Sequence, residues 1–96
     1  MPLLRVVHTA NEMLVIVCDA ELLDKEFKEG EFRLKVHRSF YNGKEASVKE
    51  CLAALRQATI ANMVGSIVEY AIKEGLIDRK NVIRIQNVPH AQMVRV

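Results

Sequence analysis

The chain has 96 residues, half of them hydrophobic and 27% charged, with a formal net charge of +2. This balance is typical of one globular domain over residues 1–96 with a modest core, and it excludes a low-complexity or linker-rich chain. The mild positive charge permits a polyanionic partner without requiring one. No apolar run approaches the roughly 20 residues that a membrane span needs, so we expect no membrane partner.

The two cysteines and the N-terminal residues indicate a cellular compartment. Cys18 and Cys51 stand alone within apolar segments, which is typical of buried thiols in a reducing environment rather than of a disulfide framework. The first residues, MPLLRVVHTANEM, lack the order of basic, long apolar and small residues that marks a signal peptide. We therefore expect a cytoplasmic protein.

Two strands are predicted at the start of the chain, on either side of a turn at residues 10–12. Leu3–Thr9 is short and rich in β-branched residues. Met13–Cys18 is apolar at every position, as expected for a strand in the middle of a sheet that is covered on both faces. Asp19 is then expected to cap a short helical turn that ends at Leu23.

The next stretch is predicted to form a connection, a strand and a loop. Lys25–Glu31 is highly charged and is expected to be a connection that turns at Gly30. Phe32–Arg38 alternates between apolar and basic residues, which predicts a strand with one buried face. Ser39–Ala46 contains the turn signal Asn42-Gly43 and is expected to be a loop.

The stretch Ser47–Gly75 holds the only long helical pattern in the sequence. Its first residue and Glu50 can form a capping box, and its last residue, a glycine, suits the left-handed position after a helix end. The apolar stripe shifts by about 140° along the stretch. We therefore predict two helices that are separated at Ala58–Thr59, with Thr59 capping the second. The alternative is one long helix with partners on opposite faces.

The C-terminal part is predicted to return to strands after a connection at Ile77–Asn81. Val82–Gln86 alternates between apolar and polar residues, as a strand does. Asn87–Gln92 is expected to turn around its proline. Met93–Val96 is expected to be a short last strand or the hairpin partner of Val82–Gln86.

This order of elements predicts an α+β domain that is built as a two-layer α/β sandwich. We expect a mixed or antiparallel sheet packed by two helices that meet near Ala58–Thr59. The core side chains expected from the helical stretch are Ile60, Val64, Ile67, Val68 and Ile72.

Short segments with a characteristic order and spacing run through the chain. They are Cys18–Leu23, Phe27, Glu29-Gly30, Phe40–Gly43, Ala58–Gly65, Gly75–Asp78 and Val88–Gln92. Together they resemble an archaeal family of uncharacterised proteins, domain of unknown function 424, over nearly the whole chain. The resemblance implies an archaeal cytoplasmic protein with a two-layer α/β fold, and it implies no activity. Asp24 and Asn87 stand where the family pattern has glycine, and both residue types tolerate left-handed backbone.

The first candidate site is a basic strand face with an adjoining loop. Its residues, expected to bind anions or RNA, are Arg33, Lys35, His37, Arg38, Tyr41 and Lys44. Clustered cations contact phosphates, and Tyr41 with its neighbour Phe40 offers rings on which single-stranded bases stack. Arg5 and Arg84 join this face if their strands pair nearby. The alternative is a solvated sheet face with both rings inside the core.

The second candidate site is a ligand pocket. Its residues are Tyr41, Asn42, Thr59, Asn62, Gly65, His90 and Gln92. Gly65 would allow close approach of another backbone or of a ligand, and a histidine that is fixed beside a proline can clamp a ligand. This hypothesis requires Tyr41, Asn62 and His90 to converge. The alternative is that these residues cap a helix, permit packing and order a turn.

The remaining chemistry-bearing residues predict no further site. The histidines and cysteines lack the paired spacing of metal ligands, and we expect no metal or cofactor. The leading hypothesis is a non-enzymatic binding protein for RNA or for a ribonucleoprotein complex of the translation type. The alternatives are a structural or homodimeric interaction module, suggested by the doubly apolar strand, and a small-molecule binder or enzyme around Tyr41, Asn62 and His90.

Overall fold

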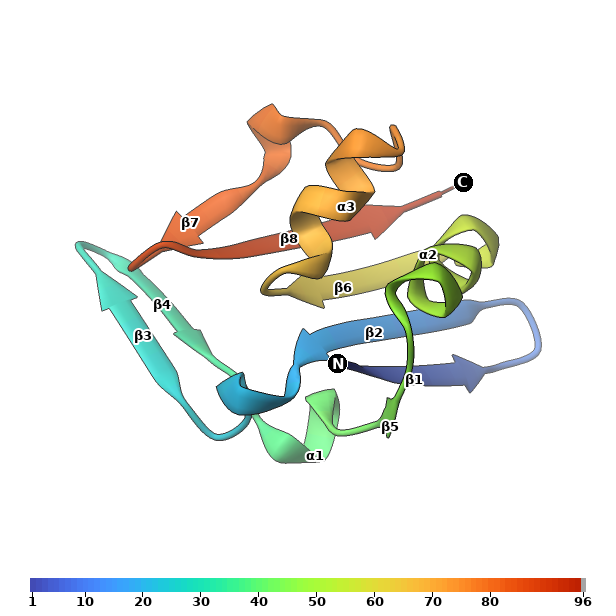
Figure 1. The fold of residues 1–96 in the computed structure, drawn as a ribbon, viewed down its shortest axis with the longest axis horizontal. Coiled ribbons are helices and arrows are strands. Elements are labelled where there is room, and N and C mark those ends of the chain that lie inside the picture. The colour runs from blue at the N-terminus through green and yellow to red at the C-terminus, as the bar shows by residue number, and fades with distance from the viewer. Residues whose placement is uncertain (96) are drawn as a thin grey trace.

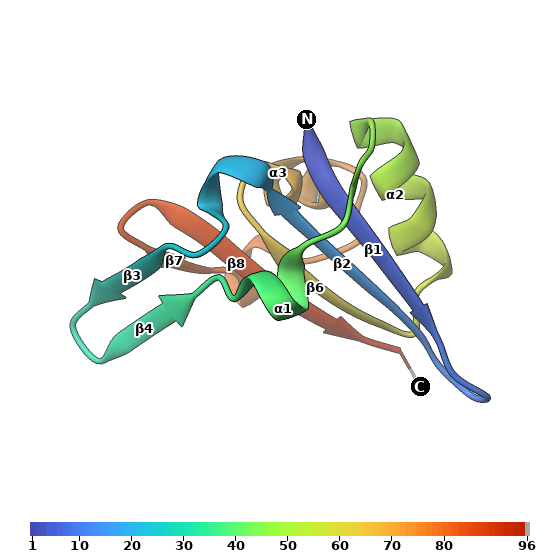
Figure 2. The same ribbon diagram turned by 90° about the horizontal axis from the view of Figure 1, so that it is seen from below.

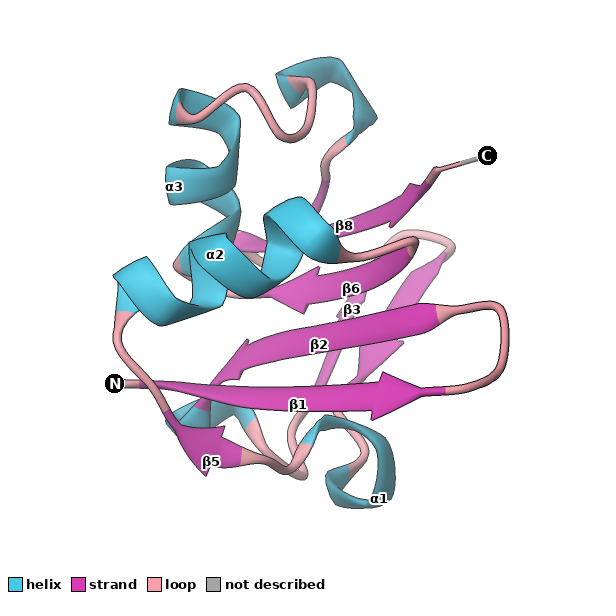
Figure 3. Cartoon of the chain, turned by 90° about the vertical axis from the view of Figure 1, so that its right-hand side faces the viewer, coloured by secondary structure: helices cyan, strands magenta, loops and turns pink. Residues whose placement is uncertain are grey.

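The computed structural model describes residues 1–95 and shows a six-stranded sheet with two helices on one face (Figures 1 and 3). The strands are β1 (Pro2–His8), β2 (Met13–Asp19), β3 (Glu26–Glu29), β4 (Phe32–Lys35), β5 (Lys44–Glu45), β6 (Ile60–Val64), β7 (Ile83–Ile85) and β8 (Val88–Val94). The helices are α1 (Arg38–Tyr41), α2 (Val48–Gln57) and α3 (Ile67–Lys73), and 3₁₀ turns lie at Ala20–Leu22 and Arg79–Asn81.

The main sheet has the strand order β5-β1-β2-β6-β8-β7. The strands β2 and β6 are parallel, and the other neighbouring pairs are antiparallel, so the sheet is mixed. The strands β3 and β4 form a separate hairpin. These features confirm the α+β class and the mixed sheet that the sequence predicts.

The strand β2 is buried on both faces, as its composition predicts. Val15 and Val17 belong to the core under α2 and α3, whereas Ile16 and Cys18 belong to a second core on the opposite face. All four are fully buried. The β3–β4 hairpin and α1 supply cover on the second face (Figure 2). The homodimer alternative rested on the need to cover both faces of this strand, and the chain itself covers both.

The separation of the helical stretch near Ala58 is confirmed, but its nature is different from the prediction. The capping box between Ser47 and Glu50 is present, and α2 ends at Gln57. The following segment, Ile60–Val64, is strand β6 rather than the start of a helix. The two helices therefore do not meet at Ala58–Thr59, and the alternative of one long helix is also wrong.

Tertiary pairing explains why residues 60–64 form a strand. Parallel pairing with β2 gives this segment's backbone hydrogen-bonding partners, and alternation sends Ala61 and Met63 into the core beneath the helices. The apparent phase shift of the apolar stripe arises because a strand lies between two helices. Thr59 caps no helix: its hydroxyl accepts a hydrogen bond from the Met13 N–H at 2.8 Å and donates one to the Glu12 carboxylate at 2.6 Å.

The end of α3 follows the predicted pattern. Gly75 has a φ of +72°, and the Leu76 N–H donates to the Ala71 carbonyl at 2.9 Å. This geometry satisfies a carbonyl at the helix end, as expected for a left-handed glycine in this position.

The function of Asp19 differs from the prediction. Its side chain does not cap the turn at Ala20–Leu22. The carboxylate instead accepts hydrogen bonds from the backbone N–H of Ser66 at 2.8 Å and from the Ser66 hydroxyl at 2.7 Å. Asp19 therefore supplies an acceptor and a negative charge to the start of α3, where the helix dipole favours both.

Three predictions for the middle of the chain are wrong in part. The expected connection Lys25–Glu31 contains β3, and the chain turns at Gly30 into β4. The Glu29 carboxylate accepts a hydrogen bond from the Gln86 N–H at 2.7 Å, which links this hairpin to the β7–β8 turn. The expected loop Ser39–Ala46 contains α1 and β5. The expected strand Phe32–Arg38 ends at Lys35, and its first side chain is exposed.

The C-terminal turn lies earlier than predicted. Gln86 and Asn87 have positive φ values of 51° and 66° and form the β7–β8 turn, whereas Pro89 lies within β8. Gly65 donates to the Pro89 carbonyl at 2.9 Å, while the Gly65 carbonyl accepts from Val68. The carbonyl that would face a Pro89 N–H thus already has a donor, and the proline leaves no backbone acceptor of β6 unpaired at this position.

The expected last strand is part of a longer one. The hairpin partner of β7 is the first half of β8, and Met93 pairs with Ala61 of β6 instead. Val96, the end of the expected strand, lies outside the described residues. Asp24 and Asn87 have φ values of 69° and 66°, which confirms that both adopt the left-handed backbone expected in place of glycine.

We predict that Gly65→Ala destabilises the fold more than Gly75→Ala does. Both glycines have positive φ, but a Cβ at Gly65 would lie 2.7 Å from the Asp19 Cγ, whereas a Cβ at Gly75 meets open space. We expect losses in free energy of unfolding of roughly 2 kcal/mol or more for Gly65→Ala and about 1 kcal/mol for Gly75→Ala, measured by urea unfolding. Equal losses would show that the Asp19 contact is unimportant.

Candidate functional site

The face of the sheet opposite α2 and α3 carries side chains in rows, because paired residues on neighbouring strands point to the same side. One row consists of Arg5, Ile16, Asn62 and Gln92. The next row consists of Val7, Leu14, Ile60 and Val94. A polar row and an apolar row therefore lie side by side on this face.

The short helix α1 lies over the same face (Figure 2). The Arg5 guanidinium donates from one nitrogen to the carbonyl of Ser39 at 3.1 Å and to that of Phe40 at 2.9 Å. These bonds hold α1 against the sheet. The Phe40 and Tyr41 rings pack edge to face, with centroids 4.9 Å apart.

Tyr41, Asn62 and His90 converge, as the pocket hypothesis requires. The Tyr41 hydroxyl donates to the Asn62 Oδ1 at 2.6 Å, and the His90 Nε2 lies 3.3 Å from the same oxygen. Tyr41 is buried, and the Cys18 thiol donates to its carbonyl at 3.6 Å. The three side chains come from α1, β6 and β8, which are distant in the sequence.

Burial favours the neutral form of both titratable groups of this cluster. Burial raises the pKa of Tyr41 to about 12, with a smaller contribution from Cys18, while the hydrogen bond to Asn62 acts in the opposite direction. Burial also lowers the pKa of His90 below its usual value of 6.5. A neutral His90 that donates from Nε2 to Asn62 fits this geometry.

A shallow groove of about 230 Å³ lies beside the cluster. Its lining includes Leu14, Phe40, Ile60, Asn62, Gln92 and Val94. The Asn62 Nδ2 has no hydrogen-bond partner within residues 1–95. Since no buried side-chain nitrogen or oxygen in this part of the chain lacks a partner, the Asn62 Nδ2 is not fully buried, and Asn62 lines the groove. The amide is thus fixed at its oxygen and open at its nitrogen.

The other residues of the predicted pocket are divided between this site and other places. Gln92 is the cross-strand neighbour of Asn62 and lines the groove. Asn42 follows α1 and is exposed. Thr59 lies before β6 beside Glu12, and Gly65 follows the opposite end of β6 and contacts Asp19. Asn42, Thr59 and Gly65 therefore do not contribute to the groove.

The predicted basic face is interrupted by acidic partners. Arg33 lies 3.7 Å from Glu26, and Arg38 lies 2.8 Å from Asp24. Arg84 pairs with Glu69 of α3, away from the β3–β4 hairpin.

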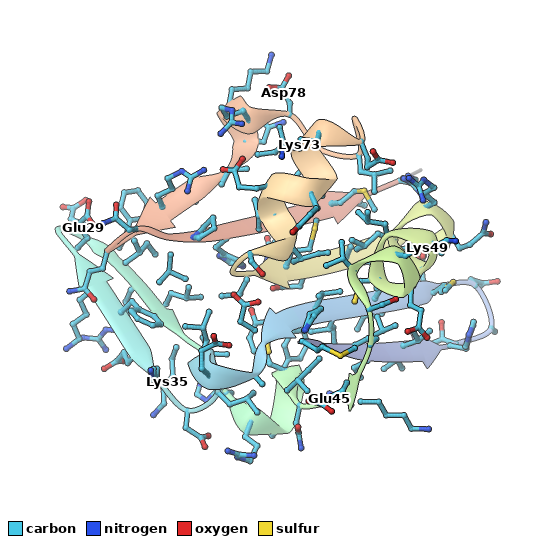
Figure 4. The ribbon with its side chains drawn as sticks, in the orientation of Figure 1. Glu29, Lys35, Glu45, Lys49, Lys73 and Asp78 are labelled. Atoms are coloured by element: carbon cyan, nitrogen blue, oxygen red, sulfur yellow. The ribbon has the colours of Figure 1, made fainter. Side chains whose placement is uncertain are left out.

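The other members of the predicted basic face lie in separate places. Lys35, His37 and Lys44 are exposed. Lys35 lies on the hairpin (Figure 4), and Lys44 belongs to β5. Tyr41 is too buried to stack on a base, whereas Phe40 lines the groove.

The groove includes residues that the sequence argument did not select. Leu14 and Ile60 form its apolar floor, and the latter was expected to face a helical core. The alternation of Ile60, Asn62 and Val64 is the signal that would have identified a strand with these side chains on one face.

Other reactive groups lie away from the groove or are inert. No cluster of three or more histidine, cysteine or acidic side chains with metal-binding geometry occurs within residues 1–95. Burial raises the pKa of Cys18 and of Cys51 to about 11, so both remain thiols at neutral pH. No helix among the described residues is long and apolar enough to cross a bilayer.

The model of a family described as "Protein of unknown function (DUF424)" matches residues 7–96. The chain belongs to the DUF424 family. Its fold is similar to that in the "Crystal structure of an uncharacterized conserved protein from Methanopyrus kandleri", with a TM-score of 0.77 and 24% identity over 96% of this chain and 89% of that one. None of the curated proteins compared with the chain matches it. The first likeness shows the family of the chain, and the second shows its fold. Neither indicates an activity.

We predict that Tyr41 titrates late and that its neutral form stabilises the fold. Its pKa rises from 10.0 to about 12 on folding, so this stabilisation is complete below pH 10 and is lost as the pH rises toward 12. An ultraviolet absorbance titration should show a phenolate step near pH 12 that is missing in Tyr41→Phe. Identical titrations of the two proteins would contradict the buried, hydrogen-bonded hydroxyl.

Proposed function

We propose that this DUF424 protein is a non-enzymatic binding module that holds a base of single-stranded RNA in the groove on the open sheet face. The observation that carries the proposal is the Asn62 amide, which Tyr41 and His90 fix at its oxygen and which presents its nitrogen beside an aromatic ring and an apolar floor.

The groove has the parts that a base requires. Phe40 offers a ring for stacking, and base–aromatic stacking contributes about 1–3 kcal/mol per base. Leu14 and Ile60 offer apolar contact to the other atoms of the base. Asn62 and Gln92 offer hydrogen-bonding groups to its edge. Single-stranded RNA is recognised through this combination of stacking and edge contacts.

One cation near the groove supports a polyanionic ligand. Arg5 lies in the same row as Asn62, two strands away, a distance of about 10 Å across a sheet. Its contacts are to backbone carbonyls, and among residues 1–95 it has no carboxylate partner. Lys44 pairs with Leu4, which packs against the core under α2 and α3, so the Lys44 side chain lies on the opposite face of the sheet and does not contribute to the groove. The charge of Arg5 suits a phosphate beside a bound base.

The chemistry of the cluster favours binding over proton transfer. The Tyr41 hydroxyl and the His90 imidazole are both neutral near pH 7 and both point at the same amide oxygen. They orient Asn62, and an amide neither donates a proton nor attacks a substrate under these conditions. A role in holding a ligand follows.

We further propose that the protein works in an archaeal cytoplasm. The two cysteines are free and buried, which suits a reducing compartment. The structurally similar protein comes from Methanopyrus kandleri.

We expect the protein to bind fluorescein-labelled RNA of about eight nucleotides, a length within the site size of small single-strand binders, with an affinity that falls as salt rises. Fluorescence anisotropy measures this binding. Phe40→Leu should weaken it about tenfold by removing the stacking ring. Asn62→Ala should weaken it by a similar factor, because the base edge loses its donor.

The matched control is Asn11→Ala, which removes an exposed asparagine from the β1–β2 turn and should leave binding unchanged. Unlabelled uridine monophosphate as a competitor shows whether the groove binds a free nucleotide as well as it binds a base within RNA. Competition at concentrations equal to those of RNA would identify a free nucleotide as the ligand and overturn RNA binding. Equal binding by the wild type, Phe40→Leu and Asn62→Ala would place the RNA elsewhere and overturn the groove.

A further inference from the structure

We infer, on the basis of the proposed function, that the groove selects uracil over cytosine through the fixed direction of the Asn62 amide. The Asn62 Oδ1 receives the Tyr41 hydroxyl at 2.6 Å and faces the His90 Nε2 at 3.3 Å. An amide oxygen has two lone pairs: the Tyr41 hydroxyl occupies one, and the neutral His90 tautomer that carries its hydrogen on Nε2 occupies the other. The part of Asn62 that remains for a ligand is the Nδ2 group, which only donates.

A donor at this position requires an acceptor on the base. Uracil and cytosine have the same size and differ at position 4, where uracil carries a carbonyl and cytosine carries an amino group. The uracil carbonyl can accept from the Asn62 Nδ2. The cytosine amino group would face another N–H and leave both groups without a partner, which is the source of strong discrimination in polar sites.

Gln92 extends the recognition to the next atom of the base edge. It lies opposite Asn62 on the neighbouring strand β8, and directly paired side chains have Cβ atoms about 4.5–5.5 Å apart. Its side chain is exposed and lines the same groove, so its amide is free to rotate. The Gln92 oxygen can accept from the uracil N3–H while Asn62 donates to the adjacent carbonyl.

The test compares oligouridine and oligocytidine of equal length, which carry the same charge. We expect the wild type to bind oligouridine about tenfold more tightly, the usual order for one lost polar pair. Asn62→Asp replaces the donor with an acceptor but keeps an oxygen for Tyr41 and His90. Its negative charge weakens both complexes, so the readout is the ratio of the two Kd values, which should reverse in favour of oligocytidine.

Two further variants strengthen the comparison. Asn11→Asp adds the same charge at the β1–β2 turn and should preserve the preference for oligouridine. Tyr41→Phe frees one lone pair of the Asn62 oxygen and should reduce the preference, while thermal unfolding shows that the variant is folded. This loss of preference would mark Tyr41 as a positioning residue.

The outcomes separate the inference from the proposed function. Equal binding of oligouridine and oligocytidine by the wild type, together with weakening of both by Asn62→Ala, would overturn the selectivity and leave RNA binding in the groove. An unchanged preference in Asn62→Asp would also overturn it. Binding of neither RNA would overturn the proposed function itself.

Discussion

The parallel pairing of β2 with β6 is the interaction on which the rest of the structure depends. It places two apolar strands side by side in the middle of the sheet, and four side chains of β2 are fully buried there. Burial of each such side chain contributes roughly 1.5–3 kcal/mol. Because parallel neighbours require a long crossover, the chain leaves the sheet after β2, adds the short edge strand β5 on the way, and returns to the centre of the sheet at β6. The hairpin, α1 and α2 belong to this crossover, and between them they cover both faces.

The candidate site follows from the same pairing. Alternation along β6 sends Ala61 and Met63 toward the helices and leaves Asn62 on the opposite face, within a row that runs from Arg5 to Gln92. The crossover brings α1 over this face, so that Tyr41 reaches the Asn62 amide. A polar side chain in an otherwise apolar sheet centre needs hydrogen-bonding partners, and Tyr41 and His90 supply them. The arrangement that satisfies the amide oxygen leaves its nitrogen without a hydrogen-bond partner among residues 1–95.

Local signals in the sequence predicted much of the fold. The capping box at Ser47, the left-handed glycine after α3 and the doubly buried strand β2 are confirmed, since each depends on a few neighbouring residues. The sequence predicts a helix over Ile60–Val64, which is strand β6 in the structure, because helical patterns on both sides obscure five residues of alternation. The proline in β8 predicts a turn, whereas the structure places it inside a strand. Its missing N–H is harmless only because the Gly65 carbonyl bonds elsewhere, a fact of the tertiary structure.

For the site, the sequence by itself determined the residue types. Among them are an asparagine, a tyrosine and a histidine, whose side chains can form hydrogen bonds with one another when the fold brings them together. It also predicted basic residues on one face of a strand at Phe32–Arg38 and in the loop that follows, yet it could not show that Glu26 and Asp24 lie beside two of them. Only the tertiary structure decided that Tyr41, Asn62 and His90 converge and that Asn42, Thr59 and Gly65 stay apart. The physical reason is that strand order and register set these distances, and both depend on contacts between residues far apart in the chain.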